Sequence, residues 1–445
     1  MKRGIKDSIF RNKSFVPVSA FFLFALCGIL GIQLTIRPLP NNSFALGKEM
    51  ISMFIPFLMS MTYLIVLCVI KSLTFRTLLL VFSLFVVLVL PFKGVLGDPI
   101  EYHKKDDAFI YSLTAKNMVE AQTLWCGDGL LTGNENVRHF TRQPGYRYYV
   151  AMWILLFGTE QRLFQFINMG IYVVCMALLL HKSLHTNLDT RILSGTLAFL
   201  FLSAPFAAKM ILMGIAEWLA LVLLMFGTIF FVQKKYAYSA VFFALAPFMR
   251  QNLLIVSALF FIILLLHSNK KILLSLWYFM LILLPLWHNI YYGHALRFFA
   301  DYGRTEKLML FSHPDSSMFL TTIKNVLYHL SLYSGIDYRS DLHTNLVAVT
   351  FIPFGTLLVV YMGKRLGGIL RYAFWCLISF AVAPTLFFGW AYYPRFEFVN
   401  LFVAVLSYII LCNSRLPGLC RGIIKNTMTW TGPCERTTHS RSQRY

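Results

Sequence analysis

Charged residues, and acids above all, are scarce in this chain of 445 residues. Only 13% of the residues are Asp, Glu, Lys or Arg, and 19 acids stand against 40 bases. Hydrophobic side chains make up 58%, and the mean hydropathy is +0.65. Soluble globular domains carry about 25% charged residues. The composition therefore excludes an ordinary soluble domain and predicts an all-α polytopic membrane protein, because helices satisfy their own backbone groups in lipid.

Cysteine is present but unorganised. The eight cysteines are scattered, and only Cys126 lies in an expected external loop. No Cys-x-x-Cys pair or Cys/His cluster is found, so the sequence indicates neither a disulfide framework nor zinc. Internal repeats of about 20–50 residues and low-complexity linkers are also lacking, which argues against a solenoid.

Long apolar runs are abundant, and many have the roughly 17–23 residues that a bilayer core of about 30 Å requires. The first run, 15–36, follows a basic start and has no Ala-x-Ala-like cleavage site, so we expect a retained span. About twelve transmembrane helices result, with both termini cytoplasmic. The expected spans are 15–36, 50–70, 77–92, 162–181, 191–209, 216–233, 236–249, 250–267, 271–290, 344–363, 370–389 and 396–413.

The distribution of charge fixes the expected orientation. The segments assigned to the cytoplasm carry 22 Lys and Arg against 3 Asp and Glu, and the rest of the chain carries 18 against 16. Cytoplasmic loops of membrane proteins are enriched in Lys and Arg. The excess positive charge therefore follows the topology, and it gives no support to a nucleic-acid partner.

Four regions follow from these spans. Residues 1–92 form an N-terminal three-span segment, and 93–161 form a large external loop with short interfacial helices. Residues 162–413 form a transmembrane core interrupted by a second external stretch, 291–343, and 414–445 form a basic tail that we expect to be disordered. Within the loop, segment 147–158 is too short to cross a bilayer and is predicted to be re-entrant or interfacial.

The external loop holds the best candidates for chemistry. Asp106 and Asp107 precede AFIYSLTAKNMVE, a run predicted to be a helix that contains Tyr111. Carboxylates at a helix N-terminus are stabilised in the ionised form, which suits a general base or a cation contact. A divalent cation therefore stays open as a cofactor, although no metal-ligand spacing is present. A plain N-cap explains the pair equally well.

Candidate residues outside the acidic pair lie at the external ends of spans. Glu217 begins an apolar span, where an acid faces a cavity or partner or reaches the headgroups. Arg250 and Arg395 are guanidinium groups suited to phosphate. An anchor in an aromatic belt is the alternative for Arg395; it explains Tyr392 and Tyr393 well and the Arg-Phe-Glu sequence less well. Arg142 precedes an expected Pro-Gly turn and is a candidate for substrate contact. His288 is treated as a loop residue.

The order of these motifs resembles the GT-C superfamily of polyprenyl-phosphate-sugar-dependent glycosyltransferases. That group includes the protein O-mannosyltransferases and the aminoarabinose transferases of lipid A. The resemblance covers roughly residues 90–400. It rests on DDAFIYSLTAKNM, QPGYRYYVAMWILLFGTEQRLFQFINM, IAEWLALVLL, ALAPFMRQNLLIV and YYPRFEF. This chain departs from the group in having three spans before the acidic loop, in lacking the usual Glu after the acidic pair, and in Phe109, where some relatives have Arg.

The resemblance implies sugar transfer, with inversion, from a polyprenyl-phosphate carrier to a hydroxyl of a glycan, lipid or protein acceptor on the external face. Asp106 or Asp107 would be the general base, and Arg250 and Arg395 would bind the donor phosphate. Glu217, Arg142 and Tyr111 would contact the acceptor, with holding an arginine in place as the alternative role for Glu217. Membrane lipids would surround the chain, in a bacterial inner membrane or in an ER membrane. The alternatives are a Wzy-like polysaccharide polymerase, whose main loop comes later in the chain, and a transporter or flippase of lipid-linked glycans.

Overall fold

The computed structural model describes residues 73–89, 107–124, 144–159, 161–183, 190–212, 214–294, 296, 346–387 and 395–414, and four single residues between 323 and 330. Every regular element among them is a helix, which confirms the all-α prediction for this part of the chain. The helices are α4 (Leu73–Val89), α5 (Asp107–Glu120), α7 (Pro144–Phe157), α8 (Gln161–Ser183), α9 (Thr190–Leu212), α10 (Glu217–Val232), α11 (Tyr236–Met249), η3 (Gln251–Leu253), α12 (Leu254–His267), α13 (Lys271–Ile282), α14 (Leu284–Gly293), α17 (Leu346–Arg365), α18 (Gly368–Phe387) and α19 (Arg395–Cys412).

Hydropathy located these helices closely. The expected segments 162–181, 216–233 and 396–413 correspond to α8, α10 and α19, with bounds that differ by a few residues. The expected spans 15–36 and 50–70 lie outside the described residues, as does the basic tail.

Membrane-length helices are fewer than the expected spans. Within the described ranges, Leu163–Lys182 is long and apolar enough to cross a bilayer, and 61% of its apolar window is buried. Helices α13 and α14, bent by 46°, make a second if they count as one broken span. Shorter apolar helices form most of the remaining bundle. A buried core helix of a soluble protein can be equally long and apolar. The twelve transmembrane spans therefore stay a prediction.

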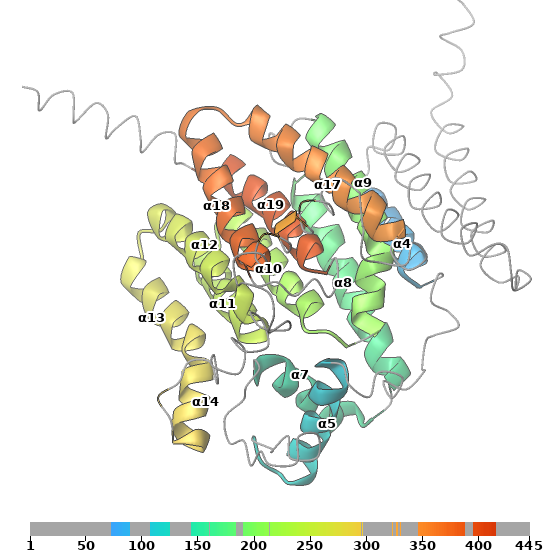
Figure 1. The fold of residues 1–445 in the computed structure, drawn as a ribbon, viewed down its shortest axis with the longest axis vertical. Helices are drawn as coiled ribbons and strands as arrows, with labels where there is room; N and C mark the ends of the chain where they lie inside the picture. The colour runs from blue at the N-terminus through green and yellow to red at the C-terminus, as the bar shows by residue number, and fades with distance from the viewer. Residues whose placement is uncertain are drawn as a thin grey trace, which may run out of the picture.

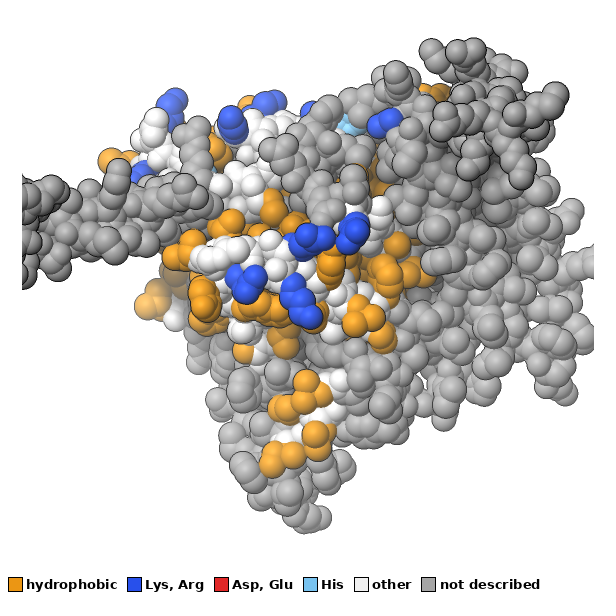
Figure 2. Space-filling model, turned by 90° about the horizontal axis from the view of Figure 1, so that it is seen from above, with side chains coloured by type: hydrophobic (Ala, Val, Ile, Leu, Met, Phe, Trp, Pro, Cys, Tyr) orange, Lys and Arg blue, Asp and Glu red, His pale blue; other side chains and the backbone are white. Residues whose placement is uncertain are grey.

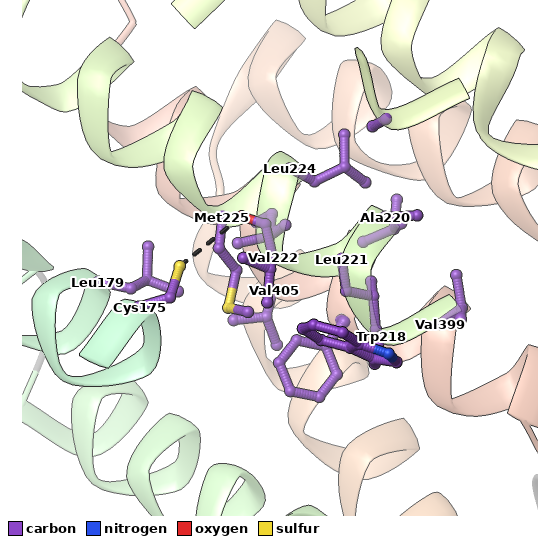
Figure 3. Close-up of a cluster of buried hydrophobic side chains, with 14 of the residues drawn as sticks. Cys175, Leu179, Trp218, Ala220, Leu221, Val222, Leu224, Met225, Val399 and Val405 are labelled. Carbon is purple, nitrogen blue, oxygen red and sulfur yellow. Dashed lines mark hydrogen bonds between the residues drawn. The ribbon is translucent and has the colours of Figure 1, made fainter. Parts of the chain in front are cut away.

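Helix α10 occupies the centre of the bundle and packs against α8, α11 and α19 (Figure 1). Its sequence, EWLALVLLMFGTIFFV, is apolar on every side, and most of its residues are buried. Such a helix is stable only when other helices enclose it. In Figure 3, Met225 of α10 lies between Cys175 of α8 and Val405 of α19, and the Cys175 thiol donates a hydrogen bond to the Val222 carbonyl oxygen at 3.7 Å.

Helices α10 and α11 form a tight antiparallel hairpin. A Cβ atom on Gly227 would lie 2.4 Å from the ring of Phe243, so only glycine allows this approach. The Ser239 hydroxyl also donates to the Gly227 carbonyl oxygen at 2.8 Å. The turn between the helices is formed by residues 233–235, and the open end of the hairpin brings Glu217 and Arg250 to the same end of the bundle.

The two ends of the bundle differ in character. Viewed from above in Figure 2, Lys and Arg side chains lie on one end, and no described Asp or Glu side chain is visible there. Helices α5, α7 and α14 lie at the opposite end, at the bottom of Figure 1. Exposed bases lie at helix ends and in the α10–α11, α12–α13 and α17–α18 turns: Arg191, Lys234, Lys235, Lys270, Lys271, Lys364, Arg365 and Arg371.

The expected Pro-Gly turn after Arg142 is wrong. Pro144 and Gly145 are the first residues of α7, so the short helix begins before the predicted 147–158. Proline is favoured at the first helical position because its missing N–H would have no helical partner there. The helix has 14 residues, about 21 Å at 1.5 Å per residue, which is shorter than a bilayer core.

Candidate functional site

An ion pair closes the open end of the α10–α11 hairpin. The Nη2 atom of Arg250 lies 3.1 Å from Oε1 of Glu217, with 14% of the arginine side chain and none of the glutamate side chain exposed. Glu217 is the first residue of α10, and Arg250 follows the last residue of α11 in an extended conformation (φ −146°, ψ 108°). A buried charge requires a partner of opposite sign, and each residue supplies it to the other.

The start of α19 joins this pair. The guanidinium carbon of Arg250 lies 5.7 Å from the centre of the Phe396 ring, a cation–π geometry. Glu397, the next residue, is fully buried. The backbone of α19 begins at Arg395, so two predicted phosphate-binding residues lie at neighbouring helix ends; the side chain of Arg395 is outside the described residues.

Helix α7 packs directly against the end of α11. A Cβ atom on Gly145 would lie 2.5 Å from the carbonyl oxygen of Phe248, two residues before Arg250. On the next residue, the hydroxyl of Tyr146 accepts a hydrogen bond at 3.4 Å from Nε1 of Trp218, which follows Glu217. Glycine is required where two backbones approach this closely. Helix α7 is thus attached to the Glu217–Arg250 pair.

Helix α5, which follows the acidic pair, lies against α7. The rings of Tyr111 and Tyr146 meet edge to face, with centroids 5.2 Å apart and planes at 72°. The fully buried guanidinium of Arg147 lies over the Tyr111 ring at 5.9 Å. Because residues four apart on a helix share one face, position 107 and Tyr111 belong to the same side of α5.

A second polar contact connects α7 to α14. The hydroxyl of Tyr148 hydrogen-bonds Nδ1 of His288, and the Tyr148 ring packs on Phe248 with centroids 5.8 Å apart. His288 lies within α14 and is 5% exposed, so its treatment as a loop residue is wrong. The helix, with the sequence LPLWHNIYYG, begins just before Pro285, and proline is tolerated in a first helical turn.

Burial controls the chemistry of the α7 tyrosines. Desolvation raises the pKa of Tyr146, Tyr148 and Tyr149 well above the ordinary value of 10.0, because the phenolate is poorly solvated in these positions. These phenols are therefore neutral near pH 7. Their hydroxyls already bond Trp218, His288 and Asn168, and they are unsuited to act as general bases.

The structure thus brings part of the expected set together. Glu217 and Arg250 meet directly, and Tyr111 reaches them through Tyr146 and Trp218. The backbones of Asp107 and Arg395 begin α5 and α19. Asp106 and Arg142 lie outside the described residues. Among the residues that the structure describes, no cluster of His, Cys, Asp or Glu could hold a metal ion, so the divalent cation stays an open prediction.

Sequence reasoning missed three residues of this region. Arg147 and Glu397 are fully buried charged residues, and Tyr146 is buried between α5 and α10. Arg147 lies in the sequence YRYY and Glu397 in RFEF. Both are surrounded by aromatic residues, which is typical of a membrane interface. Only their burial distinguishes them from such anchors.

Known proteins supply no further information on this site. No protein-family model, no curated protein and no solved structure matches the chain.

Proposed function

We propose that this chain is an integral-membrane glycosyltransferase of the GT-C type, with its active site at the end of the bundle that carries α5 and α7. The observation that carries the proposal is the meeting of distant segments at that end. The start of α10, the end of α11 and the start of α19 converge there through Glu217, Arg250 and Phe396. Helices α5 and α7 contact the same place through Tyr146.

The surface supports a membrane setting. Large apolar side chains are exposed along α13 and α18, where water would disfavour them and lipid would not. Bases gather at the opposite end (Figure 2), as expected of the cytoplasmic side. The active site would then face the periplasm or a lumen. Side chains exposed on these two helices include Ile272, Leu276, Phe279, Met280, Tyr372 and Phe380.

The reaction would proceed by a single displacement. Asp106 or Asp107 takes the proton of the acceptor hydroxyl, and the hydroxyl oxygen attacks the anomeric carbon of the donor sugar. The bond from that carbon to the phosphate oxygen breaks, and polyprenyl phosphate leaves with the electron pair. The product is inverted at the anomeric carbon. Proton transfer by a placed carboxylate contributes typically about 10²–10⁴-fold to rate.

Positive charge stabilises the leaving phosphate, and Arg250 and Arg395 supply it. Arg250 is held in place by Glu217 at 3.1 Å. A phosphate that reaches Arg250 approaches a guanidinium whose position is already fixed, so little conformational freedom is lost on binding. In this proposal Glu217 orients Arg250, in addition to the acceptor contact that the resemblance implies.

The experiment that tests this function is transfer of labelled sugar from a polyprenyl-phosphate donor, in membranes that contain the native chain or a variant. Asp106→Asn or Asp107→Asn should lower transfer by about 10²-fold or more at unchanged expression. Glu120→Gln is the matched control, because Glu120 is an exposed acid at the other end of α5 that pairs only with Lys116 at 3.7 Å among the described contacts. Full transfer by both Asn variants would remove the acidic pair from the mechanism.

One observation favours a second candidate, a transporter of lipid-linked glycans. Helices α13 and α14 form a pair bent by 46°, and transporters bind substrates at such discontinuous helices. The buried residues His288 and Asn289 lie just beyond the bend. If the native chain consumes no donor but moves a lipid-linked glycan across vesicle membranes, this candidate replaces the enzyme.

A further inference from the structure

We infer that a sugar unit binds at the seam between α7 and α8, on Trp153, Asn168 and Tyr172. Each of these side chains has a buried polar atom without a hydrogen-bond partner among the residues that the structure describes. The atoms are Nε1 of Trp153, Nδ2 of Asn168 and the hydroxyl of Tyr172. Asn168 and Tyr172 are completely buried, and Trp153 is 7% exposed.

Phe164 of α8 connects the three side chains. Trp153 packs edge to face on Phe164 of α8, with centroids 5.3 Å apart. Asn168 follows Phe164 by four residues and Tyr172 follows by four more, so all three α8 positions share one helix face. The step from Asn168 to Tyr172 is about 6 Å along the axis, from 1.5 Å per residue. A sugar ring carries hydroxyl groups at comparable separations.

The amide of Asn168 is already oriented. Tyr149 of α7 donates its hydroxyl proton to Oδ1 of Asn168 at 2.5 Å. This bond satisfies one end of the amide and leaves Nδ2 as a donor. An indole N–H and an amide NH₂ are donors only, and a phenol can donate as well. The ligand must therefore present several acceptor oxygens, as the hydroxyl and ring oxygens of a sugar do.

Aromatic rings complete the site. Tyr149 lies between Phe164, with centroids 6.0 Å apart, and Trp218, with centroids 6.1 Å apart. Such rings bury the C–H faces of a sugar, while the polar atoms bind its oxygens. Trp218 follows Glu217, so the proposed sugar site is separated from the Glu217–Arg250 pair by one aromatic layer. Tyr149 is half-buried, whereas Asn168 and Tyr172 are fully buried.

Unpartnered donors at full burial are otherwise costly. A buried polar atom without a partner destabilises a protein by an amount comparable to a lost hydrogen bond, and few remain in native structures. Three along one seam are the observation from which a ligand that supplies acceptors is inferred. That the ligand is a sugar rests on the proposed function; that it is rich in hydrogen-bond acceptors rests on the three atoms alone.

The test compares the full-length purified chain with Asn168→Leu, Tyr172→Phe and Tyr278→Phe variants. Tyr278→Phe is the matched control, because the Tyr278 hydroxyl is buried but hydrogen-bonds Ser257 Oγ at 2.9 Å. The probes are soluble methyl glycosides of hexoses and pentoses, and the readouts are melting temperature and tryptophan fluorescence. A ligand that binds only the folded state raises the melting temperature.

We expect a glycoside to raise the melting temperature of the native chain and of Tyr278→Phe, and to leave Asn168→Leu and Tyr172→Phe unshifted. Without glycoside, Tyr172→Phe should melt no lower than the native chain, whereas Tyr278→Phe should melt lower. The inference is overturned if no glycoside shifts the native chain, or if the seam variants respond as the native chain does. It is also overturned if an experimental structure obtained with the glycoside holds only water at the three atoms.

Transfer assays on the same proteins separate this inference from the proposed function. If the chain transfers sugar from the donor but no glycoside raises its melting temperature, the sugar site is rejected and the proposed glycosyltransferase activity is retained. Glycoside protection of the native chain without turnover would keep the sugar site and reject the glycosyltransferase.

Discussion

Glu217 and Arg250 meet at 3.1 Å across the open end of the α10–α11 hairpin, with the carboxylate fully buried and the guanidinium nearly so. The first residue of α10 is thereby joined to the residue that follows α11. Helix α19 reaches the same guanidinium through Phe396. The pair therefore fixes the relative positions of three helix ends as well as the charge at the proposed active site.

Replacing Arg250 alone should lower the free energy of unfolding more than replacing both Glu217 and Arg250. Arg250→Met leaves a buried carboxylate without its cation, and breaking a buried pair in this way costs about 3–5 kcal/mol. The double variant Glu217→Gln/Arg250→Met should recover a large part of that loss in unfolding free energy. The measurement is a double-mutant cycle by denaturant unfolding in detergent. Additive single effects would show that the two side chains are not coupled.

Gly145→Ala should separate α7 from α11. Its Cβ atom would lie 2.5 Å from the Phe248 carbonyl oxygen, a backbone atom that cannot rotate away. Overpacking of this kind costs about 1–3 kcal/mol, and sugar transfer should fall as well because α7 is displaced. Gly170→Ala is the control: apart from its chain neighbours and the nearby backbone of its own helix, no described atom lies within 4 Å of its added Cβ, and alanine favours the helix. Equal melting temperatures and equal transfer for the two variants would contradict the close packing.

The buried tyrosines of α7 should make the fold sensitive to alkali. Burial raises the pKa of Tyr146 above its unfolded value of 10.0, so the neutral form is favoured in the folded protein. The resulting stability is complete below about pH 10 and is lost as the pH rises above it. Tyr146→Phe cannot ionise there, so its melting temperature should fall less steeply than that of the native chain above that pH.

The control for this measurement is the melting temperature near pH 7. There Tyr146→Phe should be less stable by about 1 kcal/mol, because Trp218 Nε1 loses its acceptor. Parallel pH profiles for the two proteins would mean that Tyr146 is solvated in the folded state.

The two ends of the bundle should be accessible from opposite sides of a membrane. In a background without the eight native cysteines, Lys270→Cys at the basic end and Lys116→Cys on α5 place exposed thiols at opposite ends. A membrane-impermeant maleimide added to intact cells should label the α5 position and not the basic end. Labelling of both positions, before the cells are opened, would contradict the proposed orientation.

Periodicity and hydropathy predicted the helices well and the site only in part. Apolar runs placed α8, α10 and α19 because a helix that buries or embeds most of its surface must be apolar along its length. Glu217 was found because an acid beside such a run is unusual. Holding an arginine in place was one of the two roles expected for Glu217, but the sequence did not indicate which arginine. Arg250 itself was expected to bind a phosphate, and in the structure it contacts Glu217.

The remaining residues depend on contacts that no local pattern records. Pro144-Gly145 has the composition of a turn, but proline is also favoured at the start of a helix; the structure shows that α7 begins there, with Gly145 against Phe248. His288 follows an apolar run and precedes a polar stretch, and only packing against Tyr148 shows that it is buried. The tyrosines around Arg147 in the sequence are typical of a membrane interface. In the structure its guanidinium lies over the ring of Tyr111, which belongs to a different helix.

Helix α19 is the last helix that the structure describes, and its first turn contributes Phe396 and Glu397 to the site. A ribosome makes α10 and α11 long before it makes α19, so the nascent chain carries the Glu217–Arg250 hairpin while one side of it is still uncovered. The proposed site is completed only when synthesis has passed residue 397. Partly made chains would therefore be inactive, and an interrupted product would expose the apolar side of α10 that normally lies against α19, a surface that quality-control proteases can recognise.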